Sequence, residues 1–374
     1  MRLQRRSFLL GSGASLLAAA AGAQESRDGA YMALWATTQS MVVPGLDGGL
    51  PPGLDLNSLP PAARAQIEGL LGPKKLLEVR LWSPGAAPAN AKANLDIPAA
   101  LQLGETLPLD ISRPEQRKPE ATQAPKEFRL ADDFEIRLYW GCSESVAAGQ
   151  PKVMNLSTLT GPEREAWKRA ANQGAGYVEK PDWTQAVWPN AKQAQGGRPG
   201  APNFGGPPKA GSLKGGYTLK TSYLGQAPFT VTQADFLDAV VFTSPGKDIN
   251  LKRAIPLAWK PIPTALGLHL FAVAMKDSKT LIMWSAGPNS GGTAAAPSFP
   301  SMAEVKEMVE KGVFLRPEVG TCSIPAGIFD GTQAAMLQMI AYGPGQAFES
   351  PNAPNIRVQT RSMGMLPLGA GFGR

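Results

Sequence analysis

The sequence predicts a mainly β protein, built from one or two antiparallel β-sandwiches with long loops and a few short helices. Several segments alternate apolar and polar residues with a period of two, which is the pattern of half-buried strands. Glycine (41) and proline (35) together make up about a fifth of the 374 residues, against a usual share of roughly 12%. A chain of this composition is rich in loops, and its length allows one or two domains with a substantial core.

Residues 1–23 have the features of an export signal peptide. Arginines precede a short apolar run of small residues, and Ala21–Ala23 ends that run as an A-x-A cleavage site. The adjacent Arg5 and Arg6 in "RRSFLL" resemble a twin-arginine signal, and an ordinary secretory signal is the alternative. Either route predicts a mature chain that begins near Gln24 and is periplasmic or secreted.

Charge and hydropathy argue against a nucleic-acid-binding surface and against a transmembrane segment. The formal net charge is +7, and arginines of the signal contribute three of these charges. Lysine and arginine are spread along the chain without a basic block, which disfavours a nucleic-acid-binding surface. After the signal no apolar run approaches 18 residues, so we expect no transmembrane segment in the mature chain.

The N-terminal half begins with a low-complexity segment and continues into strands. Residues 24–76 are rich in Pro, Gly and Leu, with a short helix predicted at 62–71. The period then changes to two in "LLEVRLW", and we predict an N-terminal β domain over 77–160. The apolar positions that share one strand face are Leu77, Val79 and Leu81.

The segment "FEIRLYWGC" ends on the first of only two cysteines. Strict alternation places Cys142 on the same face as Ile136, Leu138 and Trp140, which predicts that its side chain points into the core.

The second cysteine, Cys322 in "GTCSIPAG", shares parity with Ile324 and is also predicted to face inward. Two core-facing cysteines in an exported protein favour a structural disulfide between Cys142 and Cys322. Two buried free thiols are an alternative. A reactive Cys142 is the least favoured one, because Glu144 opposes formation of the thiolate.

Residues 161–215 are predicted to form an irregular loop rich in aromatic residues, Gly and Pro. Exposed aromatic rings in this loop would be candidate contacts for a ligand or partner. The alternative is that they cover an edge of the sandwich core. The four residues are Trp167, Tyr177, Trp183 and Trp188.

Residues 216–374 give the clearest β pattern and are predicted to form a C-terminal β-sandwich domain. One strand ends at Trp259 and another begins at Gly267, and "TLIMWSAG", "AAMLQMIAYGP" and "NIRVQTRSM" supply three more. One helix interrupts them, with Ser301 as N-cap, Glu304 at the third helical position and Gly312 after its end.

Two resemblances follow from these segments. The strand "LAW", a Pro/Ala turn and a second strand resemble the B–C region of immunoglobulin-like and fibronectin type III sandwiches, with Trp259 as the buried tryptophan. The ordered motifs "YWGCSESVAAGQP", "DWTQAVWPN", "ADFLDAV", "LAWKPIPTALG", "TCSIPAG" and "IAYGPGQAFESP", spread over roughly 130–365, resemble a family of exported proteobacterial proteins of unknown function. That resemblance implies no activity and no catalytic residue.

Residues that could carry chemistry are few. His269 is the only histidine, so a Ser-His-Asp site would have to use it and a multi-histidine metal site is impossible. Its strand position predicts a structural histidine on the same face as Phe271. The acidic pairs at 132–133 and at Asp235 and Asp238 give no evidence of a catalytic carboxylate pair.

These observations predict a non-catalytic exported protein that binds an envelope protein or a glycan. No glycine-rich phosphate or dinucleotide motif is present outside the signal and the chain end, so we expect no cofactor and no metal. The alternative is a cell-envelope hydrolase, directed at glycans or esters, that uses carboxylates or a serine with His269.

Overall fold

The fold is described from a computed structural model, which covers residues 29–41, 60, 73–114, 134–158, 182–189, 206–207, 210–246, 249–292, 296–351 and 353–369. It is mainly β, as the sequence predicted, with one large sheet and two smaller ones. None of the helices in these ranges has both the length and the apolar composition needed to cross a bilayer.

The large sheet has eleven strands in the order β5-β8-β2-β1-β18-β16-β13-β14-β6-β7, and β17 pairs with β18 outside this path. The β1–β18 and β14–β6 pairs are parallel, and the other pairs are antiparallel. In this spatial order the strands are β5 (Asp110–Ser112), β8 (Thr184–Trp188), β2 (Lys74–Ser83), β1 (Tyr31–Met41), β18 (Asn355–Leu368), β16 (Ala335–Tyr342), β13 (Gly267–Met275), β14 (Thr280–Ser285), β6 (Glu135–Trp140), β7 (Lys152–Asn155) and β17 (Gln346–Phe348).

The two smaller sheets have the orders β10-β9-β3-β4 and β11-β12-β15. Their strands are β10 (Gly225–Val231), β9 (Gly215–Thr221), β3 (Ala93–Asp96), β4 (Thr106–Pro108), β11 (Phe242–Ser244), β12 (Ile255–Trp259) and β15 (Thr321–Ile324). The described helical segments are α3 (Met302–Glu310), η3 (Ala99–Leu101) and η5 (Leu156–Thr158). The C-terminal strands and the helix with its Ser301–Glu304 capping box are therefore confirmed.

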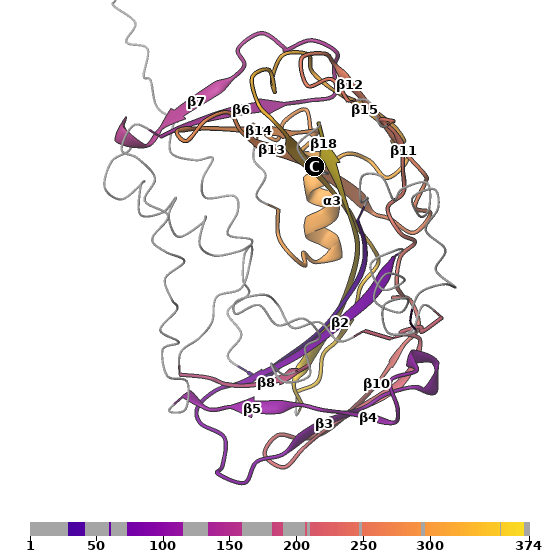
Figure 1. Ribbon diagram of the computed structural model, residues 1–374. Helices are drawn as coiled ribbons and strands as arrows, with labels where there is room; N and C mark the ends of the chain where they lie inside the picture. The colour runs from indigo at the N-terminus through magenta and orange to yellow at the C-terminus, as the bar shows by residue number, and fades with distance from the viewer. Residues whose placement is uncertain are drawn as a thin grey trace, which may run out of the picture.

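The large sheet is strongly curved, and the other layers divide between its two faces (Figure 1). The two smaller sheets lie outside the curve, one towards each end of the large sheet, and α3 lies inside it. We call these faces the convex and the concave face.

Two hydrophobic cores fill the space between the convex face and the smaller sheets. One joins the inward residues of β1 and β2, including Leu77, Val79 and Leu81, to the β3–β9–β10 sheet. The other joins β13, β14 and β16 to the β12–β15 sheet, where Trp259 is only 5% exposed. Each small sheet thus forms a sandwich with a different part of one continuous large sheet.

The segment 234–241 connects these two cores across the convex face. The hydroxyl of Thr38 donates to the carbonyl of Leu237 at 2.7 Å, and that of Ser40 donates to the carbonyl of Val240 at 2.7 Å. A Cβ atom on Gly343 would lie 2.3 Å from a Leu237 methyl carbon, and one on Gly364 would lie 2.5 Å from a Val240 methyl carbon. Glycine inside β18 and directly after β16 therefore allows this close packing, which explains the "ADFLDAV" and "AYGPG" motifs in structural terms.

The structure differs from the predicted domain boundaries. β1 lies within the 24–76 segment that was expected to have low complexity, and β8 lies within the 161–215 loop. β1 pairs with β18, and β6 from the expected 77–160 domain pairs with β14, so the two expected β domains share one sheet. These partners are far apart in the sequence, which local periodicity cannot reveal. The helix predicted at 62–71 lies outside the described residues.

Candidate binding site

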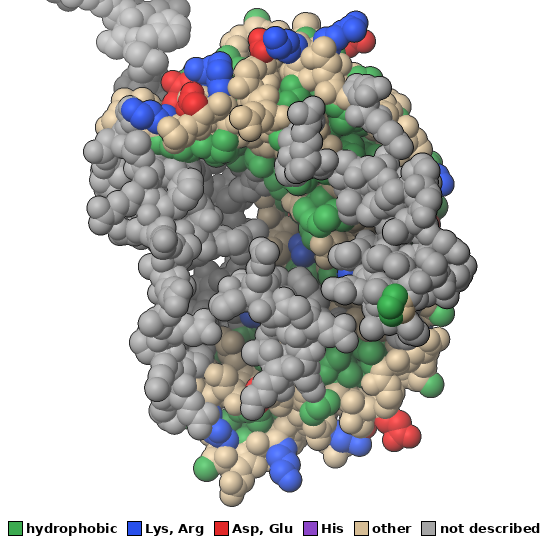
Figure 2. All heavy atoms as spheres, viewed as in Figure 1, with side chains coloured by type: hydrophobic (Ala, Val, Ile, Leu, Met, Phe, Trp, Pro, Cys, Tyr) green, Lys and Arg blue, Asp and Glu red, His purple; other side chains and the backbone are tan. Residues whose placement is uncertain are grey.

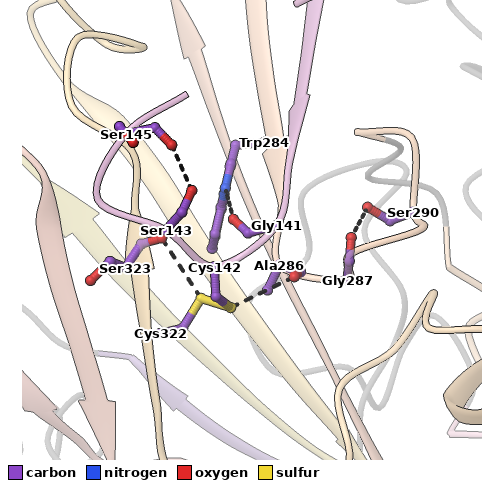
Figure 3. The surroundings of a disulfide bond; sticks show 10 residues. All are labelled: Gly141, Cys142, Ser143, Ser145, Trp284, Ala286, Gly287, Ser290, Cys322 and Ser323. Carbon is purple, nitrogen blue, oxygen red and sulfur yellow. Dashed lines mark hydrogen bonds between the residues drawn. A yellow bond between two sulfur atoms is a disulfide. The ribbon is translucent and has the colours of Figure 1, made fainter. Parts of the chain in front are cut away.

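Cys142 and Cys322 form a disulfide, which is the first of the three alternatives that the sequence left open. The sulfur atoms of Cys142 and Cys322 are 2.09 Å apart and their Cα atoms 5.0 Å apart (Figure 3). The predicted pairing is therefore present, and neither cysteine offers a free thiol.

The prediction that the Cys142 side chain points into the core was wrong, because Cys142 is exposed and only Cys322 is buried. β6 ends at Trp140, and Gly141 has a left-handed φ of 91°, so the alternation does not continue to Cys142. Within β6 it is Tyr139 that packs in the convex core, whereas Ile136 belongs to a separate cluster with β7 and β14 side chains. The turn at Gly141 carries the chain to the convex side, where Cys322 lies.

Backbone contacts hold the loop after β6 against β15. The Ser143 amide donates to the Ser323 carbonyl at 3.1 Å, and the Ala326 amide donates to the Glu144 carbonyl at 2.9 Å. The Trp284 indole donates to the Gly141 carbonyl at 3.0 Å (Figure 3). The motifs "YWGCSES" and "TCSIPAG" therefore meet in one structural corner around the disulfide.

His269 is placed as a core residue. It is 1% exposed, and its ring centroid lies 5.3 Å from that of Phe271 and 5.2 Å from that of Phe314. This geometry gives a substrate no direct route to the imidazole.

Asp235 of the second candidate pair is held in local hydrogen bonds. Asp235 accepts hydrogen bonds from the Ser212 hydroxyl (2.6 Å) and from the Leu213 and Phe236 amides (2.9 and 2.8 Å), which fixes the local backbone. Positions 132–133 lie outside the described residues. In the described ranges no group of three or more His, Cys, Asp or Glu side chains could hold a metal ion.

The four aromatic candidates are not brought together as exposed rings. Trp183 and Trp188 are each 8% exposed. Trp183 packs with Tyr31 and Trp82, and Trp188 lies in the core under the β3–β9–β10 sheet. The interpretation of these two as contact residues is therefore corrected, because their rings are buried. Trp167 and Tyr177 lie outside the described residues.

A cluster that the sequence did not reveal lies on the concave face, where β1 and β18 run side by side. Trp35 is paired with Gln359 and Thr37 with Arg361 in this register. Arg361 is in turn paired with Tyr342 of β16. Because residues directly opposite in paired strands share a face, these side chains all point to the side on which α3 lies.

The segment 297–300, just before α3, is fastened to this cluster by its backbone carbonyls. The Tyr342 hydroxyl donates to the Pro297 carbonyl at 2.9 Å, and the Gln359 amide donates to the Pro300 carbonyl at 2.9 Å. The Arg361 guanidinium donates to the Ser298 carbonyl at 2.8 Å. The segment is thereby held across β16 and β18.

Phe299 of this segment lies between an indole and a guanidinium. Its ring stacks on Trp35 with 4.9 Å between centroids and 1° between planes. The Arg361 Cζ lies 4.1 Å from the Phe299 ring centroid, in a cation–π contact. Trp35 also donates from its indole nitrogen to Gln359 at 3.1 Å. The aromatic faces of the cluster are thus used within the protein.

Arg361 has hydrogen-bond partners, but no ion pair among the described residues balances its charge. Its Nε donates to the Thr37 hydroxyl at 3.1 Å, but none of the ion pairs formed among the described residues involves Arg361. Glu78, on the same face, instead forms an ion pair with Arg80. Burial lowers the pKa of Arg361 below its ordinary value, and Coulombic interactions with Tyr342 and Glu78 oppose this effect.

The surrounding surface is basic and apolar. Arg80 lies with its Cζ 5.7 Å from the Trp35 ring centroid, and Arg357 pairs with Glu349 at 2.8 Å. In Figure 2 basic and hydrophobic side chains are visible together in the hollowed middle of this face. We call Trp35, Arg80, Phe299, Gln359 and Arg361 the arginine–aromatic cluster.

No protein-family model matches the chain, and no curated protein matches it either. The sequence contained one usable signal for the arginine–aromatic cluster. "NIRVQTRSM" was predicted as a strand, and no role was assigned to its polar residues. Only the pairing of this strand with β1 and the contact with Phe299 show that Arg361 lies against an aromatic ring.

Proposed function

We propose that this protein is a non-catalytic binding protein that holds an anionic ligand on the concave face of its large sheet, at Arg361. The observation that carries the proposal is a partly buried guanidinium without a carboxylate partner among the described residues.

A buried charge is costly unless it is paired and hydrogen-bonded. The guanidinium has five N–H donors in a planar fork. Hydrogen bonds to Thr37 and Ser298 account for two of these donors. A bound carboxylate or phosphate would accept the remaining donors and supply the missing negative charge.

Two further observations favour binding over catalysis. His269 is buried between aromatic rings, and Asp235 is engaged with backbone amides. A hydrolase that acts through His269 or through these carboxylates therefore has less support than a binding protein.

The proposal places the protein outside the cytoplasm, in the periplasm or secreted, where its ligand would be an envelope component or a glycan. The signal-like residues 1–23 and the disulfide favour an oxidising compartment. If export uses the twin-arginine route, Arg5→Lys/Arg6→Lys should leave the protein uncleaved in the cytoplasm. Normal export of this variant would indicate the ordinary secretory route.

The binding proposal is tested by calorimetric titration with inorganic phosphate, an acidic disaccharide (digalacturonate) and decanoate. We expect at least one of these probes to bind the wild type and to bind Arg361→Gln at least tenfold more weakly. Arg253→Gln is the matched control, because Arg253 is exposed on a loop. Arg361→Lys should bind with intermediate affinity, since it keeps the charge but not the fork. Binding that is equal in the wild type and Arg361→Gln would overturn the proposal, as would the absence of binding by all three probes.

A further inference from the structure

Beyond Arg361 the concave face becomes apolar and rich in methionine. Continuing along β18, the next side chains on this face are Met363 and Met365. Across β16, β13 and β14 the register places Met336 opposite Val273 and Val273 opposite Met283. All five side chains are partly buried. We call them the methionine row.

Beyond Arg361 the strands that carry this row are mostly apolar on both faces. The polar exception on the concave face is Gln338 of β16, whose amide donates to the Met363 sulfur at 2.8 Å. The residues between those of the row, such as Leu337 and Met339 in β16 and Ala272 in β13, face the convex core. A sheet face that lies against water normally carries polar residues at alternate positions, and near-continuous apolar strands indicate burial on both faces. The sequence of these strands therefore indicates that the concave face also contacts apolar groups.

Helix α3 accounts for only part of this contact. Val305 and Val309 of α3 pack above Gly267, where a Cβ atom would lie 2.7 Å from a Val309 methyl carbon. Their cluster includes Phe271 and Met363. It does not include Met336 or Met365. Met283 packs instead against Phe134 and Ile136 in a separate cluster.

The chemistry of the row suits an alkyl chain. Methionine is unbranched and flexible, so a methionine surface can adapt to ligands of irregular shape. A sugar would need open aromatic faces for stacking, but Trp35 and Phe299 are stacked on each other and Trp82 is buried. These observations favour a ligand with an alkyl chain over a glycan.

The row is continuous with the arginine–aromatic cluster. Met363 is two residues from Arg361 on the same strand face, and Met365 is four residues away, at about 13 Å. Three strand spacings, about 14 Å, separate β18 from β14. An extended chain of ten to sixteen carbons has a length of this order.

We infer that the ligand is an anionic amphiphile, whose carboxylate or phosphate head binds Arg361 and whose alkyl chain lies along the methionine row. The inference rests on the proposed function, since it names the class of ligand for the same site. It commits to a single alkyl chain with an acidic head as the occupant of the concave face.

The test is a chain-length series of hexanoate, octanoate and decanoate, titrated below their micelle-forming concentrations. Each added methylene should raise the affinity about fourfold if it is fully buried, which amounts to roughly two hundredfold from hexanoate to decanoate. Decyl phosphate should bind through the same site as decanoate. Decanol, which lacks the anionic head, should bind more weakly and without dependence on Arg361.

Met336→Glu should remove the chain-length dependence, because it places a carboxylate in the path of the alkyl chain. Met302→Glu is the matched control, since Met302 is exposed on α3. Circular dichroism and the melting temperature show whether each variant is folded, and Met336→Gln serves as a milder substitution if Met336→Glu is not.

The outcomes separate this inference from the proposed function. If phosphate or digalacturonate binds with dependence on Arg361 but affinity does not rise with chain length, the amphiphile is excluded and the anion site stands. If the protein's own chain covers the row, decanoate will bind no better than hexanoate, which also overturns the inference. If no anion binds, both proposals fail.

Discussion

Two glycines, one inside β18 and one directly after β16, are required by contacts with the segment 234–241 that packs on the convex face. Gly364 and Gly343 receive the side chains of Val240 and Leu237 at distances that leave no room for a Cβ atom. The identity of these residues is therefore explained by packing across the convex face.

Gly364→Ala should lower the free energy of unfolding by about 1–3 kcal/mol, the usual cost of overpacking a core. Urea denaturation followed by tryptophan fluorescence measures this loss. Gly216→Ala is the control, because nothing lies within 4 Å of a Cβ atom there. Equal stabilities of the two variants would show that 234–241 does not pack on β18 as described.

Trp259 gives a second prediction at the scale of one residue. Its ring is buried in the core between β12 and the large sheet. Trp259→Ala should therefore lower the free energy of unfolding by about 3–5 kcal/mol. A loss below about 1 kcal/mol in the same denaturation experiment would place the ring at the surface.

At the scale of elements, α3 was predicted almost completely from local signals. Ser301 accepts from the Glu304 amide, and the Glu304 side chain accepts from the Ser301 amide, so both halves of the capping box form. Such a motif lies within four consecutive residues, and no distant partner is needed to recognise it.

Ser301→Ala should lower the free energy of unfolding by about 1 kcal/mol, because it leaves an orphan amide at the start of α3. Ser301→Thr keeps the hydroxyl and should retain most of this stability. Hydrogen exchange of the first-turn amides measures the effect locally. Unchanged exchange in Ser301→Ala would mean that the cap does not hold the helix end.

The strand β1, in contrast, could not be predicted from local sequence patterns. Its sequence "YMALWATTQSM" mixes small, polar and large apolar residues, and no local alternation marks it as a strand. Its place between β2 and β18 depends on two partners that complete the ladder on either side. Trp35 and Arg361 come onto the same sheet face near Phe299 only through this pairing, so the arginine–aromatic cluster could not be predicted.

At the scale of the whole molecule, the disulfide joins parts that lie 180 residues apart in the chain. It links the loop after β6 in the large sheet to β15 in a small sheet. Its existence could be predicted from the cysteine count and the export expected from residues 1–23, even though strict strand alternation does not explain its geometry.

Cys142→Ser/Cys322→Ser should lower the free energy of unfolding, by at most about 5 kcal/mol according to the loop-entropy model. Thiol titration of the denatured, unreduced wild type should find no free thiol. Two titratable thiols, or a double variant as stable as the wild type, would show that the bridge does not contribute to stability.

The two faces of the large curved sheet have different roles in our account. The convex face stabilises the fold, and the concave face is the proposed ligand-binding face. The convex face is filled by two cores and by the segment that connects them. The concave face carries the arginine–aromatic cluster and the methionine row. The central claim is that these two concave features together form one ligand site.

The most direct measurement of that claim is a crystal structure of the protein grown with decanoate. We predict that the carboxylate lies within hydrogen-bonding distance of the Arg361 guanidinium, about 3 Å, and that the alkyl chain runs past Met363 and Met365. A decanoate bound elsewhere, or a concave face that excludes it while a carboxylate of the protein itself pairs with Arg361, would contradict the claim.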